Sequence, residues 1–350
     1  MSAVVTYGML AAVLWVAEQL YFKLAEHYNI VSRPTERGSH TSNVIRGGGV
    51  IFTFSICLWI LEQGLTGQGG LVREYLPFFA GLLLIAGISF WDDVRSLPDG
   101  VRLLVQFVAM ALMLGSLRGP WLVDLAWYWQ LPLVLLALVV LVGAANVVNF
   151  MDGINGITAG YALAVLLPLG LLNAAEPFVE PSFLLFTLIS VLVFSCFNFR
   201  PKGKAKCFAG DVGSIGLAFI LLFAIARLIM RTGDVTWLAL LLVYGVDGCC
   251  TIVHRMLLHE NLGQVHRKHA YQLLANELGL SHLTVSLLYA ALQLAISLIM
   301  IYFVPVQWHW PYLVAVLLLL GAAYLLFMKK YYHLHEEYLE SVKEHHTCQK

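Results

Sequence analysis

Five aspartates lie at the ends of long apolar segments, where a chemical site at a membrane edge would need them. Asp92 and Asp93 are adjacent and directly follow a run of uncharged, mostly apolar residues. Asp152, Asp211 and Asp247 each stand beside a glycine at the edge of another such run. A carboxylate beside hydrocarbon is costly unless it meets water, a cation or a hydrogen-bond donor. If the segments place all five on one side of a membrane, the chain builds an acidic, metal-binding site on that face.

The composition is that of a membrane protein. Of the 350 residues, 60% are hydrophobic and 12% are charged, and the mean hydropathy is +0.79. A soluble domain carries about 25% charged residues, so we expect this chain to cross a membrane many times. The formal net charge is zero, which predicts no basic surface for nucleic acid.

Eleven apolar runs approach the length of roughly 20 residues that a helix needs to cross a bilayer. They are continuous, unlike the short alternating strands of a membrane β-barrel. We therefore expect an all-α polytopic membrane protein, with one integral-membrane domain (residues 1–330) and a cytoplasmic C-terminal tail (331–350). The expected transmembrane helices are 3–24, 47–63, 75–91, 102–118, 125–147, 157–175, 182–199, 213–230, 235–257, 282–304 and 311–328.

The distribution of basic residues predicts the orientation. With the N-terminus outside, most of the 21 Lys and Arg residues fall in the inner loops, and the only ones on or near the outer side are Arg73, Arg118, Arg227 and Arg231. Cytoplasmic loops carry the excess of basic residues in membrane proteins. We therefore expect a periplasmic N-terminus, a cytoplasmic C-terminus, and the aspartates together in an active site on the cytoplasmic face.

Four motifs in this order resemble the polyprenyl-phosphate N-acetylhexosamine-1-phosphate transferases, which initiate O-antigen and enterobacterial common antigen and include the peptidoglycan lipid I enzyme. The motifs are Asp92-Asp93, Asn146-Val-Val-Asn149-Phe-Met-Asp152-Gly-Ile-Asn155-Gly, Phe208-Ala-Gly-Asp211-Val-Gly-Ser214, and a loop rich in His and Arg before the last pair of helices. The segment Ser32 to His40, followed by Arg46 and three glycines, also resembles the first cytoplasmic loop of that family.

The resemblance implies a multi-pass enzyme of the bacterial inner membrane with two substrates, a UDP-sugar donor and a polyprenyl (undecaprenyl) phosphate acceptor. It also implies a Mg²⁺ cofactor, for which Mn²⁺ could substitute. The chemistry agrees, because Mg²⁺ prefers oxygen ligands and phosphoryl transfer mainly needs charge neutralisation and alignment. A water-soluble donor and a lipid acceptor can meet only at the membrane edge.

The resemblance assigns the metal to Asp211 and Asn149, and catalytic roles to Asp92, Asp93 and Asp152. Structural interpretations stay open beside these assignments. Asp211 could be a helix N-cap, and Asn149 could be a buried amide that bonds helix backbone. The adjacent carboxylates could form a structural pair facing Arg95 and Arg102, since like charges raise each other's pKa unless a cation is near.

Recognition of the uridine and of the lipid phosphate is assigned by the same resemblance. Phe208 would stack on uracil, although a Phe beside a membrane segment is more often a packing residue. Asn155, with Gly153 nearby, would hydrogen-bond the uracil edge. Many bacterial members carry Asp at position 155, so Asn155 is poorly suited to act as a base or metal ligand. Arg102, at the start of a helix, would contact the lipid phosphate.

The loop from residue 260 to residue 272 matches the loop that faces sugar and pyrophosphate in that family. It contributes His266, Arg267 and His269 as candidate donor-binding residues. The forked guanidinium of Arg267 suits a diphosphate. Many bacterial members end this loop in His-x-His-His, whereas this chain has His269-Ala-Tyr-Gln, so a histidine cluster is not expected.

A multi-pass transporter coupled to protons or cations is the alternative function. Transporters place ionisable residues near the middle of the membrane, and Glu18 is the only acid expected there. The sequence favours the enzyme on that ground. It leaves open which UDP-sugar is used, the length of the polyprenol, and whether the protein is a monomer or a homodimer.

Overall fold

A computed structural model describes residues 3–32, 43–117, 126–261, 263 and 266–348. Most of the expected loop from Ser32 to His40 lies outside the described residues, and so does Arg118. The helices on the N-terminal side are α1 (Ala3–His27), α2 (Val50–Leu65), α3 (Gly69–Val94), α4 (Asp99–Gly115), α6 (Trp127–Phe150) and α7 (Ile157–Ala175). Those that follow are α8 (Pro181–Asn198), α9 (Gly210–Thr232), η1 (Val235–Leu241), α10 (Leu242–Leu257), α11 (Ala270–Asn276), α12 (His282–Phe303), η2 (Val306–Trp308) and α13 (His309–Cys348).

The expected all-α polytopic architecture is confirmed. Each of the eleven predicted spans overlaps a helix, and nine helices in the described part of the chain are long and apolar enough to cross a membrane. The other two, α2 and α4, have 16 and 17 residues. At 1.5 Å per residue, 16 residues rise about 24 Å, somewhat less than the roughly 30 Å of a bilayer core. These were the second and fourth expected spans. Helix α10 also has 16 residues, but η1 directly precedes it and the two together make a span of 23 residues.

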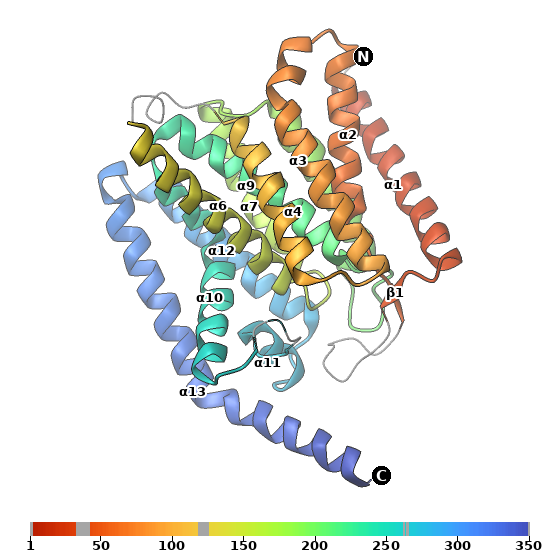
Figure 1. The fold of residues 1–350 in the computed structure, drawn as a ribbon, viewed down its shortest axis with the longest axis vertical. Coiled ribbons are helices and arrows are strands. Elements are labelled where there is room, and N and C mark those ends of the chain that lie inside the picture. Colours follow the sequence, from red (N-terminus) through yellow and green to blue (C-terminus); the bar gives the residue numbers. More distant parts are fainter. Residues whose placement is uncertain (1–2, 33–42, 118–125, 262, 264–265, 349–350) are drawn as a thin grey trace.

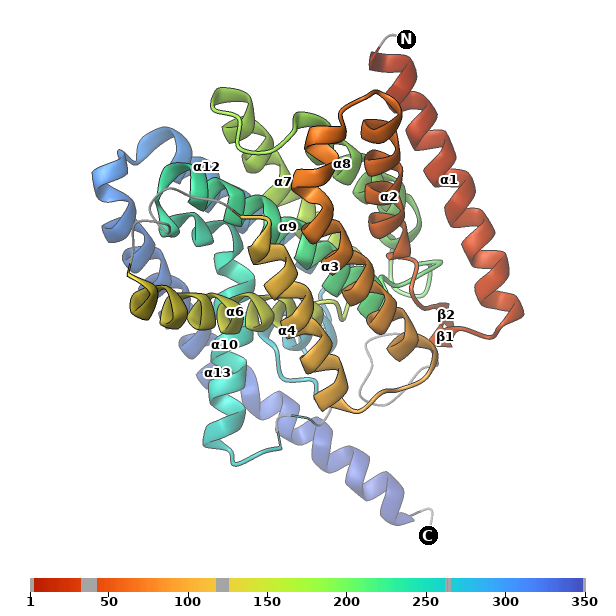
Figure 2. The ribbon, with the colours of Figure 1, turned by 45° about the horizontal axis from the view of Figure 1, so that its top comes forward.

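Helix α9 lies in the middle of the bundle, whereas α1 and α13 lie at opposite sides (Figures 1 and 2). It packs against α2, α3 and α6. Phe78 of α3 stacks on Phe219 and Phe223 of α9, with ring centroids 5.5 and 4.1 Å apart. A helix surrounded in this way is apolar on every face, as expected for the centre of a bundle. The position of α9 therefore fixes the start of the segment that carries Asp211.

The start of α9 crosses the start of α2 at backbone contact. A Cβ on Gly213 would lie 2.5 Å from the Cα of Gly49, and a Cβ on Gly49 would lie 2.3 Å from the Cα of Gly213. Close approach through small residues is common between membrane helices, because the attraction there comes from packing. Neither position can carry a larger side chain without moving a helix.

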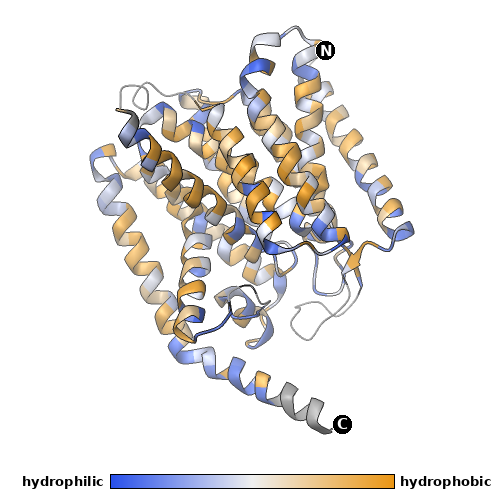
Figure 3. Ribbon diagram, viewed as in Figure 1, coloured by the Kyte–Doolittle hydropathy of each residue, from blue (hydrophilic) through white to orange (hydrophobic). Residues whose placement is uncertain are grey.

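The two ends of the bundle differ in character. The short strands β1 (Val31–Ser32) and β2 (Val44–Ile45) pair antiparallel at the end where α1 finishes. Apolar residues cover the middle of the bundle, whereas hydrophilic residues gather in the loops and along the protruding end of α13 (Figure 3). The N-terminus lies at the opposite end of the bundle from the C-terminus (Figure 1). The tail predicted at 331–350 is a helical continuation of α13 as far as Cys348.

We predict that Gly213→Ala destabilises the protein by about 1–3 kcal/mol, the usual penalty for an overpacked core. The added methyl would overlap the α2 backbone at Gly49. Gly170→Ala is the matched control in helix α7, because a Cβ there meets nothing within 4 Å. The measurement is the midpoint of thermal unfolding in detergent. Equal midpoints for the two variants would contradict the close crossing.

Candidate active site

The C-terminal end of α3 caps the N-terminus of α9. The carboxylate of Asp93 accepts hydrogen bonds from the backbone N–H groups of Asp211, at 2.9 Å, and Val212, at 3.0 Å. Gly210 has a φ of +70°, and a Cβ there would meet the Asp93 carboxylate at 2.6 Å. A carboxylate at a helix N-terminus satisfies free N–H groups and opposes the positive end of the helix dipole. This cap sets the direction in which the Asp211 side chain leaves α9.

Arg46 forms ion pairs with two of the aspartates. Its sequence position predicted no role in the site. Its Nε lies 2.6 Å from Asp93 Oδ1, and one of its terminal nitrogens lies 3.3 Å from Asp211 Oδ1. The hydroxyl of Tyr21 donates to the carbonyl of Arg46 at 2.6 Å and so ties this residue to α1. The one feature of the sequence that pointed to Arg46 is its place directly before three glycines, in the segment that resembles the first loop of the transferase family.

Arg102 provides the second cation. It lies 2.6 Å from Asp92 and 3.2 Å from Asp211, and its other arm lies 2.6 Å from Asp99. Asp92 also accepts a hydrogen bond from the backbone N–H of Leu97 at 2.6 Å. Of the two arginines considered for the adjacent aspartates, Arg102 pairs with Asp92, whereas Asp93 pairs with Arg46 instead of Arg95. The cluster thus places three carboxyl groups, those of Asp92, Asp93 and Asp211, beside two guanidinium groups.

Asn149 lies close to the first turn of α9. Its side-chain oxygen accepts a hydrogen bond of 2.8 Å from the hydroxyl of Ser214, which lies one turn after Asp211. Ser214 is fully buried, and its hydroxyl also lies 2.9 Å from the carbonyl of Gly210. The end of α6 and the start of α9 thus bring one amide oxygen and one carboxylate into the same region.

Asp152 follows α6 in the turn that leads to α7. It accepts a hydrogen bond of 2.5 Å from the hydroxyl of Thr158. Burial raises the pKa of Asp152 to about 7, the Thr158 bond opposes the shift, and the negative charges of Asp211 and Asp93 add to it. This carboxyl therefore changes charge near neutral pH.

The donor chemistry here fits Mg²⁺ better than a softer metal. Among the residues that the structure describes, no three His, Cys, Asp or Glu side chains converge on one point. Asp211 and Asn149 instead offer oxygen atoms, and Mg²⁺ is usually held by one or two carboxylates together with waters and substrate phosphates. The excess negative charge of the cluster, and the raised pKa of Asp152, are both relieved by a bound cation.

Phe208 and Asn155 are each held by hydrogen bonds to the backbone of neighbouring loops. The N–H of Phe208 donates to the carbonyl of Ile45 at 2.8 Å, and the carbonyl of Phe208 accepts from Gly48 at 2.9 Å. The ring of Phe208 is half-buried. Asn155 is buried, and its side-chain amide donates to the carbonyls of Arg200 and Pro201 at 2.9 and 3.1 Å. Its donor group therefore ties two loops together.

Gly153 has a structural reason to be glycine. A Cβ there would lie 2.2 Å from the hydroxyl oxygen of Tyr271. That hydroxyl donates to the carbonyl of Phe150 at 2.9 Å. Gly153, which the resemblance places near the uracil, is thus also where α11 packs on the turn after α6.

The candidate residues of the loop before α11 lie beside that contact. Nδ1 of His269 lies 3.4 Å from Asp247, and the ring centroid of His266 lies 5.0 Å from that of His269. Burial and the nearby cations lower the pKa of His266 to about 3, so this ring is neutral at physiological pH. Arg267 forms an ion pair of 2.8 Å with Glu277, away from the Arg46 and Arg102 pairs.

Asp247 belongs to this second group rather than to the cluster at α3 and α9. It accepts hydrogen bonds from the N–H groups of Ala270 and Tyr271 at 3.0 and 3.3 Å, and from the hydroxyl of Tyr289 at 2.7 Å. Asp247 therefore caps α11. The expectation that all five aspartates form one site is therefore wrong for Asp247.

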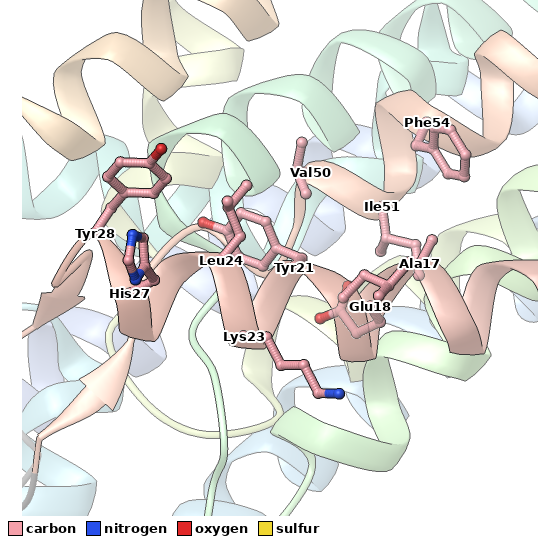
Figure 4. A pocket seen from close by; sticks show the side chains of 11 residues that line it. Ala17, Glu18, Tyr21, Lys23, Leu24, His27, Tyr28, Val50, Ile51 and Phe54 are labelled. Carbon is pink, nitrogen blue, oxygen red and sulfur yellow. The ribbon is translucent and has the colours of Figure 1, made fainter.

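A groove of about 630 Å³ opens between α1 and α2 next to the Arg46 segment (Figure 4). Apolar residues such as Leu24 of α1 and Phe54 of α2 form most of its lining, and Tyr21, the residue bonded to Arg46, also faces it. An apolar groove of this size suits a hydrocarbon chain rather than a nucleotide.

Comparisons with known proteins agree on one family. The chain is 25% identical over 276 residues to the probable undecaprenyl-phosphate N-acetylglucosaminyl 1-phosphate transferase of Bacillus subtilis. The matched region covers 74% of this chain and 73% of that protein. It is also similar to phospho-N-acetylmuramoyl-pentapeptide-transferases. That of Thermotoga neapolitana is 28% identical, over 49% of this chain and 56% of that protein. That of Thermotoga maritima is 32% identical, over 50% and 57%. The chain thus spans little more than half the length of these two relatives.

The model of glycosyl transferase family 4 matches residues 75–229. This segment begins in α3, ends in α9, and contains the aspartate pair, the motif around Asn149 and Asp152, and the motif around Asp211. These elements build the cluster of acids and arginines, so the part of the chain that is similar to glycosyl transferase family 4 is the part that carries the candidate site.

Proposed function

We propose that this protein transfers an N-acetylhexosamine 1-phosphate, or a deoxy derivative of it, from a UDP-sugar to undecaprenyl or another polyprenyl phosphate. The products are polyprenyl diphosphate-linked sugar and UMP, in the first membrane step of surface polysaccharide synthesis. The observation that carries the proposal is the cluster of three carboxylates and two arginines at the end of a membrane helix. The named activities of the relatives support it.

The reaction is a displacement at phosphorus. An oxygen of the lipid phosphate attacks the phosphorus that carries the sugar, one P–O bond forms, and the bond to the oxygen that leaves with UMP breaks. Mg²⁺, or Mn²⁺ in its place, would be held by Asp211 and Asn149 and would neutralise charge on the phosphate oxygens. Arg46 and Arg102 both pair with Asp211 and can donate to the same phosphates.

The three catalytic candidates differ in what their contacts allow. Asp93 holds the α9 N-terminus and Asp92 holds Arg102, so both act by positioning other groups. Among the described residues, Thr158 is the one side-chain donor to Asp152, and the pKa of Asp152 is about 7, which suits a proton acceptor near neutral pH. We assign it the removal of a proton from a singly ionised lipid phosphate. Phe208 and Asn155 are proposed to contact the uracil, and His266 and His269 the donor sugar or its phosphates.

The direct test uses purified protein with labelled UDP-N-acetylglucosamine, undecaprenyl phosphate and Mg²⁺. We expect label to enter a butanol-extractable lipid, together with release of UMP, and a screen of UDP-sugars would then identify the donor. If no UDP-sugar labels the lipid, and vesicles containing the protein instead take up solutes against a proton or cation gradient, the transporter alternative would replace the enzyme.

We predict that Asp211→Asn lowers kcat/KM by at least about a hundredfold, the scale of losing one preorganised electrostatic contact. The change keeps the size of the side chain but removes the charge proposed to hold Mg²⁺. Activity should be measured across a Mg²⁺ titration, with Glu62→Gln at the other end of the bundle as the carboxylate-to-amide control. Normal turnover of Asp211→Asn at low Mg²⁺ would make Asp211 a structural residue.

We predict that Asp152→Asn raises the unfolding midpoint more at pH 8 than at pH 5, in buffer without divalent cations. The ordinary pKa of an Asp is 3.8 and that of folded Asp152 is about 7. The folded state therefore holds the proton more tightly, and the stability present below pH 4 is lost as the pH rises to about 7. Asn stays neutral throughout.

The control for this prediction is Asp234→Asn, which should give the opposite sign. Burial alone would raise the pKa of Asp234, but hydrogen bonds from Thr236 and His309 lower it below its ordinary value. Its charged form therefore stabilises the fold at neutral pH, and replacing it should destabilise the protein more at pH 8 than at low pH. A shift for Asp152→Asn that is equal at both pH values would rule out a raised pKa.

We propose that the active site faces the cytoplasm of a bacterial cell and that the N-terminus is periplasmic. The support is the concentration of basic residues in the loops on that side. Fusions of alkaline phosphatase and of green fluorescent protein to the C-terminus should be inactive and fluorescent, respectively. An active phosphatase fusion at the C-terminus would reverse the orientation.

A further inference from the structure

The end of α13 that protrudes beyond the bundle rests on α11 and the loop before it (Figures 1 and 2). Three side-chain contacts hold this region together: two of them reach from α13, and the third joins the loop before α11 to the residue that follows α11. Nδ1 of His335 lies 3.1 Å from Glu277 Oε1, and Arg267 lies 2.8 Å from the same oxygen. The guanidinium of Arg267 also lies 4.1 Å from the ring centroid of Tyr338. We call these four residues, Arg267, Glu277, His335 and Tyr338, the tail latch.

The tail latch is buried. The side chains of Glu277 and His335 are each 3% exposed, and that of Arg267 is 10% exposed. Removing one partner of a buried ion pair leaves an uncompensated charge in a poorly hydrated place. A contact meant to open at each catalytic cycle would have to expose these charges every time. The burial therefore indicates a permanent support rather than a gate.

The same contacts define what Arg267 does. Its guanidinium is engaged along one edge by Glu277 and on one face by Tyr338. A bidentate grip on a diphosphate requires two parallel N–H groups directed at the ligand. Arg267 is committed to the tail latch, whereas Arg46 and Arg102 stand beside the acids.

A chain of contacts leads from the tail latch to the candidate active site. Asp247 caps α11 through the N–H groups of Ala270 and Tyr271. The hydroxyl of Tyr271 then bonds the carbonyl of Phe150 at 2.9 Å and approaches Gly153 so closely that a Cβ there could not fit. The turn that carries Asp152 therefore rests on α11, and α11 rests on α13.

We propose that the tail latch positions the active-site turn, and that Arg267, Glu277, His335 and Tyr338 are positioning residues for the transfer reaction. The C-terminal helix holds α11 in place, and α11 supports the turn between Asn149 and Asn155 through Tyr271. The effect on catalysis rests on the proposed function, whereas the mechanical link does not.

The first test measures the mechanical link without activity. Hydrogen–deuterium exchange of the purified full-length protein in detergent should become about tenfold faster over residues 266–277 in His335→Ala and in Glu277→Gln. His333→Ala and Glu337→Gln are matched controls on exposed positions of the same helix and should exchange like the wild type. Unchanged exchange in both latch variants, in protein that is otherwise folded, would overturn the proposal.

The second test separates support from direct binding by a double-mutant cycle of Arg267→Gln and Glu277→Gln. In a latch, Glu277→Gln removes the carboxylate that pairs with the buried guanidinium of Arg267, and Arg267→Gln removes the cation that pairs with the buried carboxylate of Glu277. The double variant removes both charges, so it should recover at least about threefold in kcat relative to either single variant. The KM for the UDP-sugar should change less than kcat, because a latch acts through the position of the turn and not by binding the donor. If the double variant is no better than Arg267→Gln, and KM carries the loss, Arg267 binds the donor and the positioning role is wrong.

The two tests fail in distinguishable ways. A wild-type protein that transfers no sugar phosphate would remove the proposed function, yet the exchange experiment would still report whether α13 holds α11. Faster exchange over residues 266–277 without any loss of turnover would confirm the contact and overturn its role in catalysis.

Discussion

The carboxylate of Asp93 makes the contact on which the rest of the candidate site depends. It lies at the end of α3, receives two backbone N–H groups at the start of α9, and pairs with Arg46. These N–H groups are among the unsatisfied donors of a helix N-terminus, and they carry its positive dipole. Because Asp211 leaves α9 from the capped turn, its direction is set by this cap, and so is that of Ser214 one turn later. The glycines at positions 49 and 213 allow α2 and α9 to come close enough for this arrangement.

Charge balance near hydrocarbon explains why the site holds arginines as well as acids. A cluster of carboxylates alone would be expensive beside a membrane. In the protein without substrates, Arg46 and Arg102 neutralise most of the charge of Asp92, Asp93 and Asp211. If phosphates and a divalent cation bind as proposed, they would bring both signs of charge. The arginines would then pair with phosphate and the acids with the cation, and neither state would leave a net charge uncompensated.

The position of the site follows from the solubility of the two proposed substrates. One end of the bundle collects the turns after α3 and α6 and the start of α9, where the family motifs lie. A lipid phosphate can approach this end along the membrane, and a sugar nucleotide can approach it from water. The protruding part of α13 and the short helix α11 lie at that end as well (Figure 1). Because these polar segments lie beyond the apolar part of the bundle, they do not have to be buried in the bilayer. They can therefore support the loops that are proposed to face the donor.

Sequence alone was sufficient for the all-α membrane architecture, because the length of an apolar run is a local property that a bilayer reads directly. It also singled out Asp92, Asp93, Asp152 and Asp211 as candidate site residues, and in the structure Arg46 and Arg102 bring three of them together. It could not reveal that Arg46 pairs with Asp211, 165 positions away, because that pair depends on how α2 crosses α9.

Tertiary structure also decided the places of the remaining candidates. Asp247 stands beside a glycine, as Asp211 does, yet it lies within the apolar segment Val235–Leu257 and caps α11 instead of joining the cluster. Arg267 looked suited to a diphosphate, but its neighbours Glu277 and Tyr338 come from segments that carry no motif. Hydropathy and motif spacing determine which residues reach a membrane edge. Which of those residues meet is decided by helix packing and by the pairing of buried charges, and both depend on residues far apart in the chain.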